Sequence, residues 1–227
     1  MTGALKRSPE GWWLPKDDTV FENYASPPEF RAGSPPKRDG FYRGHLLAAF
    51  PYVRAWNCAI DVGGHCGYWA YEMAQRFVAA HVFEPSPANY QCLVKNVAEF
   101  DNVRTYNLAV GAEPGWCAIQ NDRKRPGNSG SNFIVPGTGD VQVVTLDGMD
   151  FPGCDFLKVD VEGYEVRVLE GARELIKRCR PVISMECTDF KFRGRYDIPD
   201  GQAERWLLKR GYRVAWAERP DKVFVCA

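Results

Sequence analysis

A glycine-rich turn follows the first apolar run that could form a buried strand. The run Cys58–Val62 leads into Gly63, Gly64 and Gly67, which gives the spacing G-G-x-x-G, and Asp61 stands just before the turn. Glycines let the backbone approach a ligand closely, and N–H groups at the start of the next helix can bind it. The pattern predicts a turn that binds a nucleotide-type cofactor. A tight connection between strand and helix, without a ligand, is the alternative.

A carboxylate follows the next apolar run. Glu84 ends the run Ala79–Phe83, about 20 residues after the first glycine, and in open α/β sheets an acid at this place accepts hydrogen bonds from ribose hydroxyls. Taken alone, Glu84 could equally be a solvated residue at the end of a strand. Because the turn and the acid occur in the required order and at the required separation, we predict that Glu84 binds a ribose.

Three further acids follow predicted strands later in the chain. The apolar segment 154–159 leads into Asp160 and Glu162, and the segment 181–185 leads into Glu186. The carboxyl ends of parallel strands lie at the same edge of a sheet, where ligands bind. We therefore expect these acids to converge with the glycine turn in one crevice.

Strands and helices alternate around these residues. Apolar spacing predicts helices over residues 41–53, 70–77, 87–97 and 168–176, and a third strand over 102–110. A β-α-β-α-β order implies right-handed crossovers and a parallel sheet. Short strands are expected over 116–120, 132–135 and 141–146, and the last two strands, 212–217 and 222–226, predict an antiparallel hairpin at the sheet edge.

Two segments stand apart from this pattern. Residues 1–40 are rich in proline and are expected to form an arm or lid, beside a single domain over 41–227. Trp12 and Trp13 are too apolar for a solvated tail, so the arm either packs on the domain surface or covers the substrate. The basic, glycine-rich loop 121–131 is either a solvated hairpin loop or a substrate-contacting loop, in which Arg123, Lys124 or Arg125 would meet an acidic or sugar-phosphate group.

The composition limits the classes of partner and compartment. The 227 residues carry 29 Lys and Arg against 29 Asp and Glu, so no net charge attracts nucleic acid or a membrane. Eight cysteines without a C-x-x-C motif, and no apolar segment typical of a secretory signal, favour a reduced cytoplasmic location. The apolar runs are too short to span a membrane. A homo-oligomer is left open.

Several blocks of the sequence resemble the FkbM-type methyltransferases that use S-adenosylmethionine. They are residues 61–68, 82–87, 107–110, 128–131, 144–147, 156–165, 169–172 and 181–186. The resemblance implies an α/β class I methyltransferase (Rossmann-like) fold, with a seven-stranded, mostly parallel sheet, an antiparallel C-terminal hairpin and helices on both faces. The family usually has asparagine where this chain has His65, and a small or aliphatic residue where it has Cys66.

The resemblance also implies a cofactor site that runs along the sheet edge. Its residues are Asp61, Gly63, Gly64 and Gly67 at the methionine part, Glu84 at the ribose, Pro85 and Ser86 beside the adenosine, and Asn107, Ala109 and Val110 around the adenine. Asp160 and Glu162 would face the transferred methyl group. Carboxylates are favourable neighbours of a sulfonium because of its positive charge.

Methyl transfer to a hydroxyl oxygen also requires the loss of a proton. Asp160 is the predicted acceptor of that proton, either as a general base or by holding Mg²⁺ together with Glu162 and Glu186. A helix-start position for Glu162, and a contact of Glu186 with substrate or solvent, are the alternatives. His65 and His45 are alternative bases. The predicted reaction is O-methylation of a small hydroxylated molecule, a sugar or secondary metabolite.

Three other functions remain open at this point. The first is an N-methyltransferase that acts on a peptide or nucleotide, although no Asn/Asp-Pro-Pro-Tyr-like motif typical of amino-methylating nucleic-acid enzymes is present. The second is an NAD-dependent oxidoreductase, for which the sequence offers no clear Tyr-Lys pair or catalytic histidine. The third is a non-catalytic protein that binds the cofactor.

Overall fold

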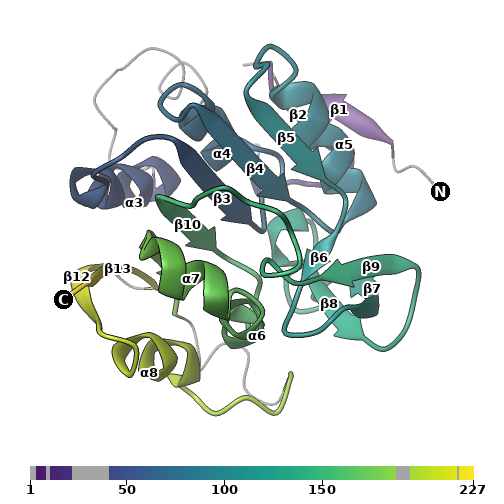
Figure 1. The fold of residues 1–227 in the computed structure, drawn as a ribbon. Helices are drawn as coiled ribbons and strands as arrows, with labels where there is room; N and C mark the ends of the chain where they lie inside the picture. The colour runs from purple at the N-terminus through teal and green to yellow at the C-terminus, as the bar shows by residue number, and fades with distance from the viewer. Residues whose placement is uncertain (1–3, 9–10, 22–40, 188–194, 219) are drawn as a thin grey trace.

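A seven-stranded sheet forms the centre of the molecule. The computed structural model describes residues 4–8, 11–21, 41–187, 195–218 and 220–227. The strand order is β12 (Tyr212–Glu218), β13 (Asp221–Cys226), β11 (Val182–Glu186), β10 (Phe156–Val159), β3 (Cys58–Val62), β4 (Ala79–Phe83) and β5 (Val103–Tyr106) (Figure 1). β13 pairs antiparallel with both β11 and β12, and the other strand pairs of this sheet are parallel. The predicted parallel sheet with a C-terminal hairpin is confirmed.

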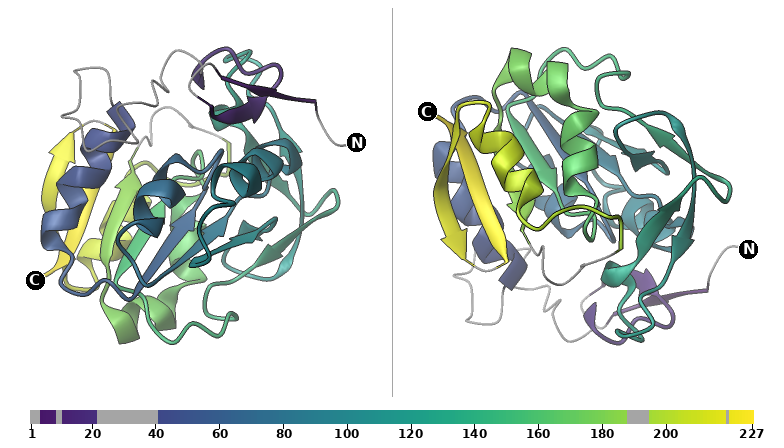
Figure 2. Two further views of the ribbon diagram at one scale, coloured as in Figure 1. Left: turned by 90° about the horizontal axis from the view of Figure 1, so that it is seen from above. Right: turned by 90° about the horizontal axis from the view of Figure 1, so that it is seen from below.

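Helices cover both faces of this sheet (Figure 2). One face packs against α3 (Phe41–Ala49), its continuation η1 (Phe50–Tyr52), α4 (Tyr68–Ala74) and α5 (Pro87–Asn96), and the other against α6 (Glu165–Glu170), α7 (Arg173–Cys179) and α8 (Gln202–Leu208). Alternate residues of a strand point to opposite faces. Accordingly, Ala59 of β3 packs in the first layer and Ile60 in the second.

The direction of the crossovers reverses between β3 and β10. The chain passes from β3 outward through β4 to β5, and later from β10 outward in the opposite direction through β11. The carboxyl ends of β3 and β10 therefore lie side by side at a switch point, which is where open α/β sheets bind ligands. The acids predicted to converge follow the strands at this edge.

A second, four-stranded sheet is inserted between β5 and β10. It consists of β6 (Ala109–Val110), β9 (Val141–Val144), β7 (Gly115–Gln120) and β8 (Phe133–Pro136), and lies beside the main sheet (Figure 1). The prediction of one strand over 102–110 was wrong. The side-chain amide of Asn107 donates to the carbonyl oxygens of Glu84 and Pro85, so the chain leaves the main sheet there and enters the second one as β6.

The single helix predicted over 168–176 is also interrupted. It divides into α6 and α7 at Gly171, where a Cβ atom would lie 2.0 Å from the carbonyl oxygen of Gly111. The Asp147 carboxylate accepts hydrogen bonds from the N–H groups of Glu174 and Leu175. This side chain caps α7 from outside the helix, which compensates for the interruption.

The described part of the N-terminal arm is docked. β1 (Leu5–Arg7) and β2 (Trp13–Pro15) form an antiparallel hairpin, and β2 packs against α5. Trp12 is buried against Tyr68, with ring centroids 4.4 Å apart. The prediction that this segment is not a solvated tail is confirmed. The rest of the predicted arm, 1–3, 9–10 and 22–40, lies outside the described residues.

All eight cysteines lie in the described ranges, and no disulfide bond joins them there. Among the ranges that the structure describes, no helix combines the length and the apolar character needed to cross a membrane.

Candidate active site

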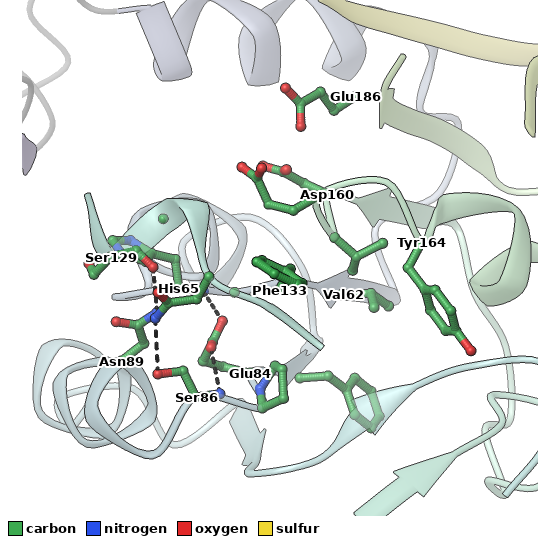
Figure 3. Close-up of a pocket in the computed structure, with 18 of the residues that line it drawn as sticks. Val62, His65, Glu84, Ser86, Asn89, Ser129, Phe133, Asp160, Tyr164 and Glu186 are labelled. Carbon is green, nitrogen blue, oxygen red and sulfur yellow. Dashed lines mark hydrogen bonds between the residues drawn. The ribbon is translucent and has the colours of Figure 1, made fainter. Parts of the chain in front are cut away.

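A cavity of about 840 Å³ lies at the carboxyl ends of β3, β4, β10 and β11 (Figure 3). This volume is typical of sites for small molecules and cofactors. The second sheet contributes Phe133 and Ile134 to its wall, and the arm contributes Val20 and Phe21. The cavity is therefore built by both sheets and by a segment that precedes the domain.

The glycine turn after β3 forms one wall. Gly63 has φ +88°, and a Cβ there would lie 1.8 Å from the Asp160 carbonyl oxygen, so only glycine fits between the two strand ends. The N–H groups of Gly63 and Gly64 both donate to the Phe83 carbonyl at 2.9 Å. These two N–H groups are therefore not available to bind a ligand. Gly67 does not line the cavity; a Cβ there would lie 2.9 Å from Leu93 of α5.

Glu84 lines the cavity directly after β4, as do Pro85 and Ser86. Its carboxylate accepts the N–H groups of His65 and Ser86, both at 2.8 Å. Burial raises the pKa of Glu84 to about 7, against the opposing effect of these hydrogen bonds. A buried carboxylate therefore follows β4, where it can accept hydrogen bonds from hydroxyl groups of a ligand.

The predicted adenine wall divides into two kinds of residue. Ala109 and Val110 line the cavity, whereas Asn107 does not. Asn107 instead holds the backbone of Glu84 and Pro85 through its two hydrogen bonds, at 2.8 and 3.1 Å. Asn107 therefore positions Glu84 and does not itself line the cavity.

Asp61 is fully buried and does not reach the cavity surface. Its Oδ1 atom accepts a hydrogen bond from Nζ of Lys158 at 3.0 Å, and the same ammonium group donates to the Gly63 carbonyl at 2.9 Å and lies 3.7 Å from Asp160 Oδ2. Asp61 and Lys158 are register partners in β3 and β10. Asp61 therefore affects the cavity indirectly, because it holds the ammonium group that binds the glycine turn. We assigned Lys158 no role from sequence, although a lysine within an apolar strand signals a buried partner.

The three acids predicted to converge do so. Asp160, Glu162 and Glu186 each offer an oxygen within 4.8 Å of the others' oxygens. Glu162 also pairs with Arg125 at 2.7 Å, and Arg125 pairs in turn with Asp122 at 3.1 Å.

Of the three basic residues of the loop, one reaches the cavity. Arg125 lines the cavity within these ion pairs, whereas Arg123 and Lys124 are exposed.

A fourth acid at this end was not predicted. Asp221 of β13 lines the cavity and is the register partner of Glu186. Its Oδ2 atom lies 2.8 Å from Nδ1 of the buried His45, which comes from α3. Burial raises the pKa of Asp221, and the hydrogen bond from His45 lowers it. Sequence offered no signal for this pair, because its members lie far apart in the chain on elements that meet only in the fold.

His65 lies at the other side of the cavity, near Glu84 (Figure 3). Its Nε2 atom is 2.7 Å from the Ser129 hydroxyl, and the ring packs 4.1 Å from that of Phe21. Burial lowers the pKa of His65 to about 4, so the ring is neutral near pH 7. Figure 3 shows Asp160 and Glu186 together, away from His65, an arrangement that favours Asp160 as the base.

The seven-stranded sheet with its antiparallel β13, and the cavity at its carboxyl edge, are those of the class I methyltransferase fold. Within that class, the model of the Methyltransferase FkbM domain matches residues 61–214, which is more than half of the sequence. The chain belongs to the FkbM methyltransferase family. The NAD-dependent oxidoreductase is therefore no longer among the alternatives.

The individual proteins that resemble this chain have low sequence identity to it. A protein named Methyltransferase 1, from Beauveria bassiana (strain ARSEF 2860), is 27% identical over an alignment of 191 residues, and the match covers 71% of this chain and 74% of that protein. The structure of Precorrin-6y C5,15-methyltransferase from Geobacter metallireducens GS-15 superimposes with TM-score 0.50 at 14% identity and covers 96% of this chain and 97% of that one.

A third match is to a longer protein. Methyltransferase FkbM from Methylobacillus flagellatus KT matches 75% of this chain with TM-score 0.49 at 17% identity. The present chain spans only 43% of that protein.

Removal of the buried ammonium group of Lys158 should destabilise the contact between the ends of β3 and β10. In Lys158→Met the Asp61 carboxylate stays buried without its partner, so we expect the free energy of unfolding to fall by about 3–5 kcal/mol in urea titrations. Lys177→Met, at an exposed lysine, is the matched control, and Asp61→Leu combined with Lys158→Met should recover much of the loss. A Lys158→Met protein as stable as the control would contradict this reading.

Proposed function

We propose that this protein transfers the methyl group of S-adenosylmethionine to a hydroxyl oxygen of a small, uncharged molecule such as a sugar or secondary metabolite. The observation that carries the proposal is that acids lie at both ends of one cavity. Glu84, the acid predicted to bind the ribose, lies near one end, and Asp160, Glu162 and Glu186 lie near the other. A donor bound along the sheet edge would lie between them.

The donor half of the cavity has the chemistry that an adenosine requires. Glu84 offers a buried carboxylate to the ribose hydroxyls, while Ala109 and Val110 offer an apolar surface to the adenine. The turn at Gly63 brings the backbone close to the end of β10, where Asp160 follows. These features support S-adenosylmethionine as the donor, which supplies an electrophilic methyl group on a sulfonium when bound.

The acceptor half favours an uncharged acceptor over an acidic one. Lys158 and Arg125 are the lysine and arginine side chains on the cavity wall that the structure describes, and both already form ion pairs, with Asp61 and Glu162. Asp160, Glu186 and Asp221 add negative charge. A phosphate or carboxylate would be repelled there, so a sugar phosphate is disfavoured and a neutral hydroxyl compound is supported.

The chemical work asked of the protein is alignment and removal of one proton. The cavity walls would hold the acceptor oxygen in line with the methyl carbon and its leaving group, which reduces the entropic part of the barrier. Asp160 would take the hydroxyl proton as the oxygen forms its bond to carbon.

Mg²⁺ remains a prediction. Carboxylate oxygens are its preferred ligands, and Asp160, Glu162 and Glu186 could hold it, where it would lower the pKa of an acceptor hydroxyl. Arg125 competes for Glu162, so an ion would have to displace that ion pair or bind without Glu162.

Calorimetric titration tests the donor directly. S-adenosylmethionine and S-adenosylhomocysteine should bind and NAD should not, and Glu84→Ala should weaken the adenosyl compounds about tenfold or more because a charged acceptor is lost. Glu99→Ala is a control outside the cavity. Binding of NAD alone, or of none of the three, would refute the proposed function.

The affinity for the adenosine part should depend on pH. Because the pKa of Glu84 is about 7, its carboxyl is mostly protonated at pH 6 and mostly ionised, and so a better acceptor, at pH 8. We expect 5′-methylthioadenosine, which lacks the titratable amino acid, to bind about tenfold more tightly at pH 8 than at pH 6. Glu84→Gln should remove the difference; if the dependence persisted, another group would be responsible.

Asp160→Asn should separate catalysis from donor binding. With an acceptor found by screening neutral hydroxyl compounds, peptides and nucleotides, we expect kcat to fall by about 10²–10⁴-fold. Affinity for S-adenosylhomocysteine should change little, and the exposed Asp150→Asn is the control. Loss of wild-type activity in EDTA, restored by Mg²⁺, would identify the metal-assisted route; turnover of only peptides or nucleotides would contradict O-methylation of a small molecule.

A further inference from the structure

A buried carboxylate in the N-terminal arm is fully engaged with neighbouring groups. Asp18 is 1% exposed. Its Oδ1 atom accepts the N–H groups of Val20 and Phe21 at 3.0 and 2.7 Å, and its Oδ2 atom accepts the N–H of Ser129 at 2.9 Å and the Ser129 hydroxyl. One side chain therefore fixes the arm's own backbone and joins it to the loop before β8.

That loop is shaped to receive the arm. The N–H groups of Thr19 and Val20 donate to the Gly127 carbonyl at 2.9 and 3.3 Å. A Cβ on Gly127 would lie 2.4 Å from the Thr19 hydroxyl oxygen, and one on Gly130 would lie 2.8 Å from the Phe21 ring. The two glycines thus leave the space that the arm occupies.

The docked arm forms part of the cavity wall. Val20 and Phe21 line the cavity, and the Phe21 ring lies 4.1 Å from the His65 ring. His65 is held at Nε2 by Ser129, the residue that Asp18 fixes, and at its backbone N–H by Glu84. A continuous series of contacts therefore runs from Asp18 to the acid assigned to the ribose.

We propose that residues 18–21 form a strap that closes the donor half of the cavity, and that Asp18 is the positioning residue that holds it. The methyl donor then binds beneath the docked strap. The strap lies outside residues 61–214, so the family domain alone does not complete the donor site. The inference depends on the proposed function for the identity of the donor.

Asp18→Asn in the full chain tests the strap. The side chain of asparagine keeps one oxygen, which can still accept the N–H groups of Val20 and Phe21. In place of the second carboxylate oxygen it has an NH₂ group, which cannot accept the Ser129 N–H. We expect S-adenosylhomocysteine to bind about tenfold more weakly or worse. The exposed neighbour Asp17→Asn is the matched control and should bind within about twofold of wild type. Hydrogen exchange without ligand should be faster at the amides of Val20, Phe21 and Ser129 in Asp18→Asn only.

A second variant displaces the strap without altering Asp18. Gly130→Ala places a methyl group against the Phe21 ring, whereas Gly153→Ala meets nothing within 4 Å. We expect Gly130→Ala to weaken S-adenosylhomocysteine and Gly153→Ala to leave it unchanged. This pair keeps the test decisive if Asp18→Asn fails to fold.

The outcomes distinguish the two proposals. Wild-type affinity in both Asp18→Asn and Gly130→Ala would overturn the strap and leave the proposed function intact. Absence of binding to wild-type protein would overturn the proposed function, and with it the strap's role in donor binding. Faster exchange throughout Asp18→Asn, together with wild-type affinity in Gly130→Ala, would show that Asp18 is only structural.

Discussion

The site depends on one buried ammonium group. Nζ of Lys158 bonds to Asp61 and to the Gly63 carbonyl, and it lies 3.7 Å from Asp160, so it joins the ends of β3 and β10 at the switch point. A lone charge in such a place would be costly, and the neighbouring carboxylates offset that cost. Because the same contacts fix the glycine turn and the start of the acidic segment, the geometry of both halves of the cavity follows from this interaction.

Several acids line the cavity although the chain carries no net charge, and the two halves of the cavity hold these acids in different ways. In the donor half, two backbone N–H groups hold Glu84, and burial raises its pKa to about 7. In the acceptor half, Arg125 partners Glu162 and His45 partners Asp221. Within the described residues, the ion pair of Asp160 is the 3.7 Å contact with Lys158, and this looser pairing supports the proposal that Asp160 exchanges a proton with the acceptor.

The sequence predicted those features that apolar periodicity and the positions of the strand ends determine. The sheet, its hairpin and the convergence of Asp160, Glu162 and Glu186 all follow from strands that end at one edge. Tertiary contacts decided the rest. Asn107 breaks a strand that its apolar pattern would continue, and Gly171 interrupts a helix because the backbone of Gly111 approaches it. The His45–Asp221 pair and the contact of Asp18 with Ser129 join distant segments, which no local pattern encodes.

The central claim is that one adenosyl donor occupies the cavity between Glu84 and Asp160, and a crystal structure of the full chain with S-adenosylhomocysteine tests it most directly. The account predicts ribose hydroxyls on the Glu84 carboxylate, adenine against Ala109 and Val110, and the sulfur facing Asp160. Density for the ligand elsewhere, or with its ribose away from Glu84, would contradict the assignment of this cavity as the donor site.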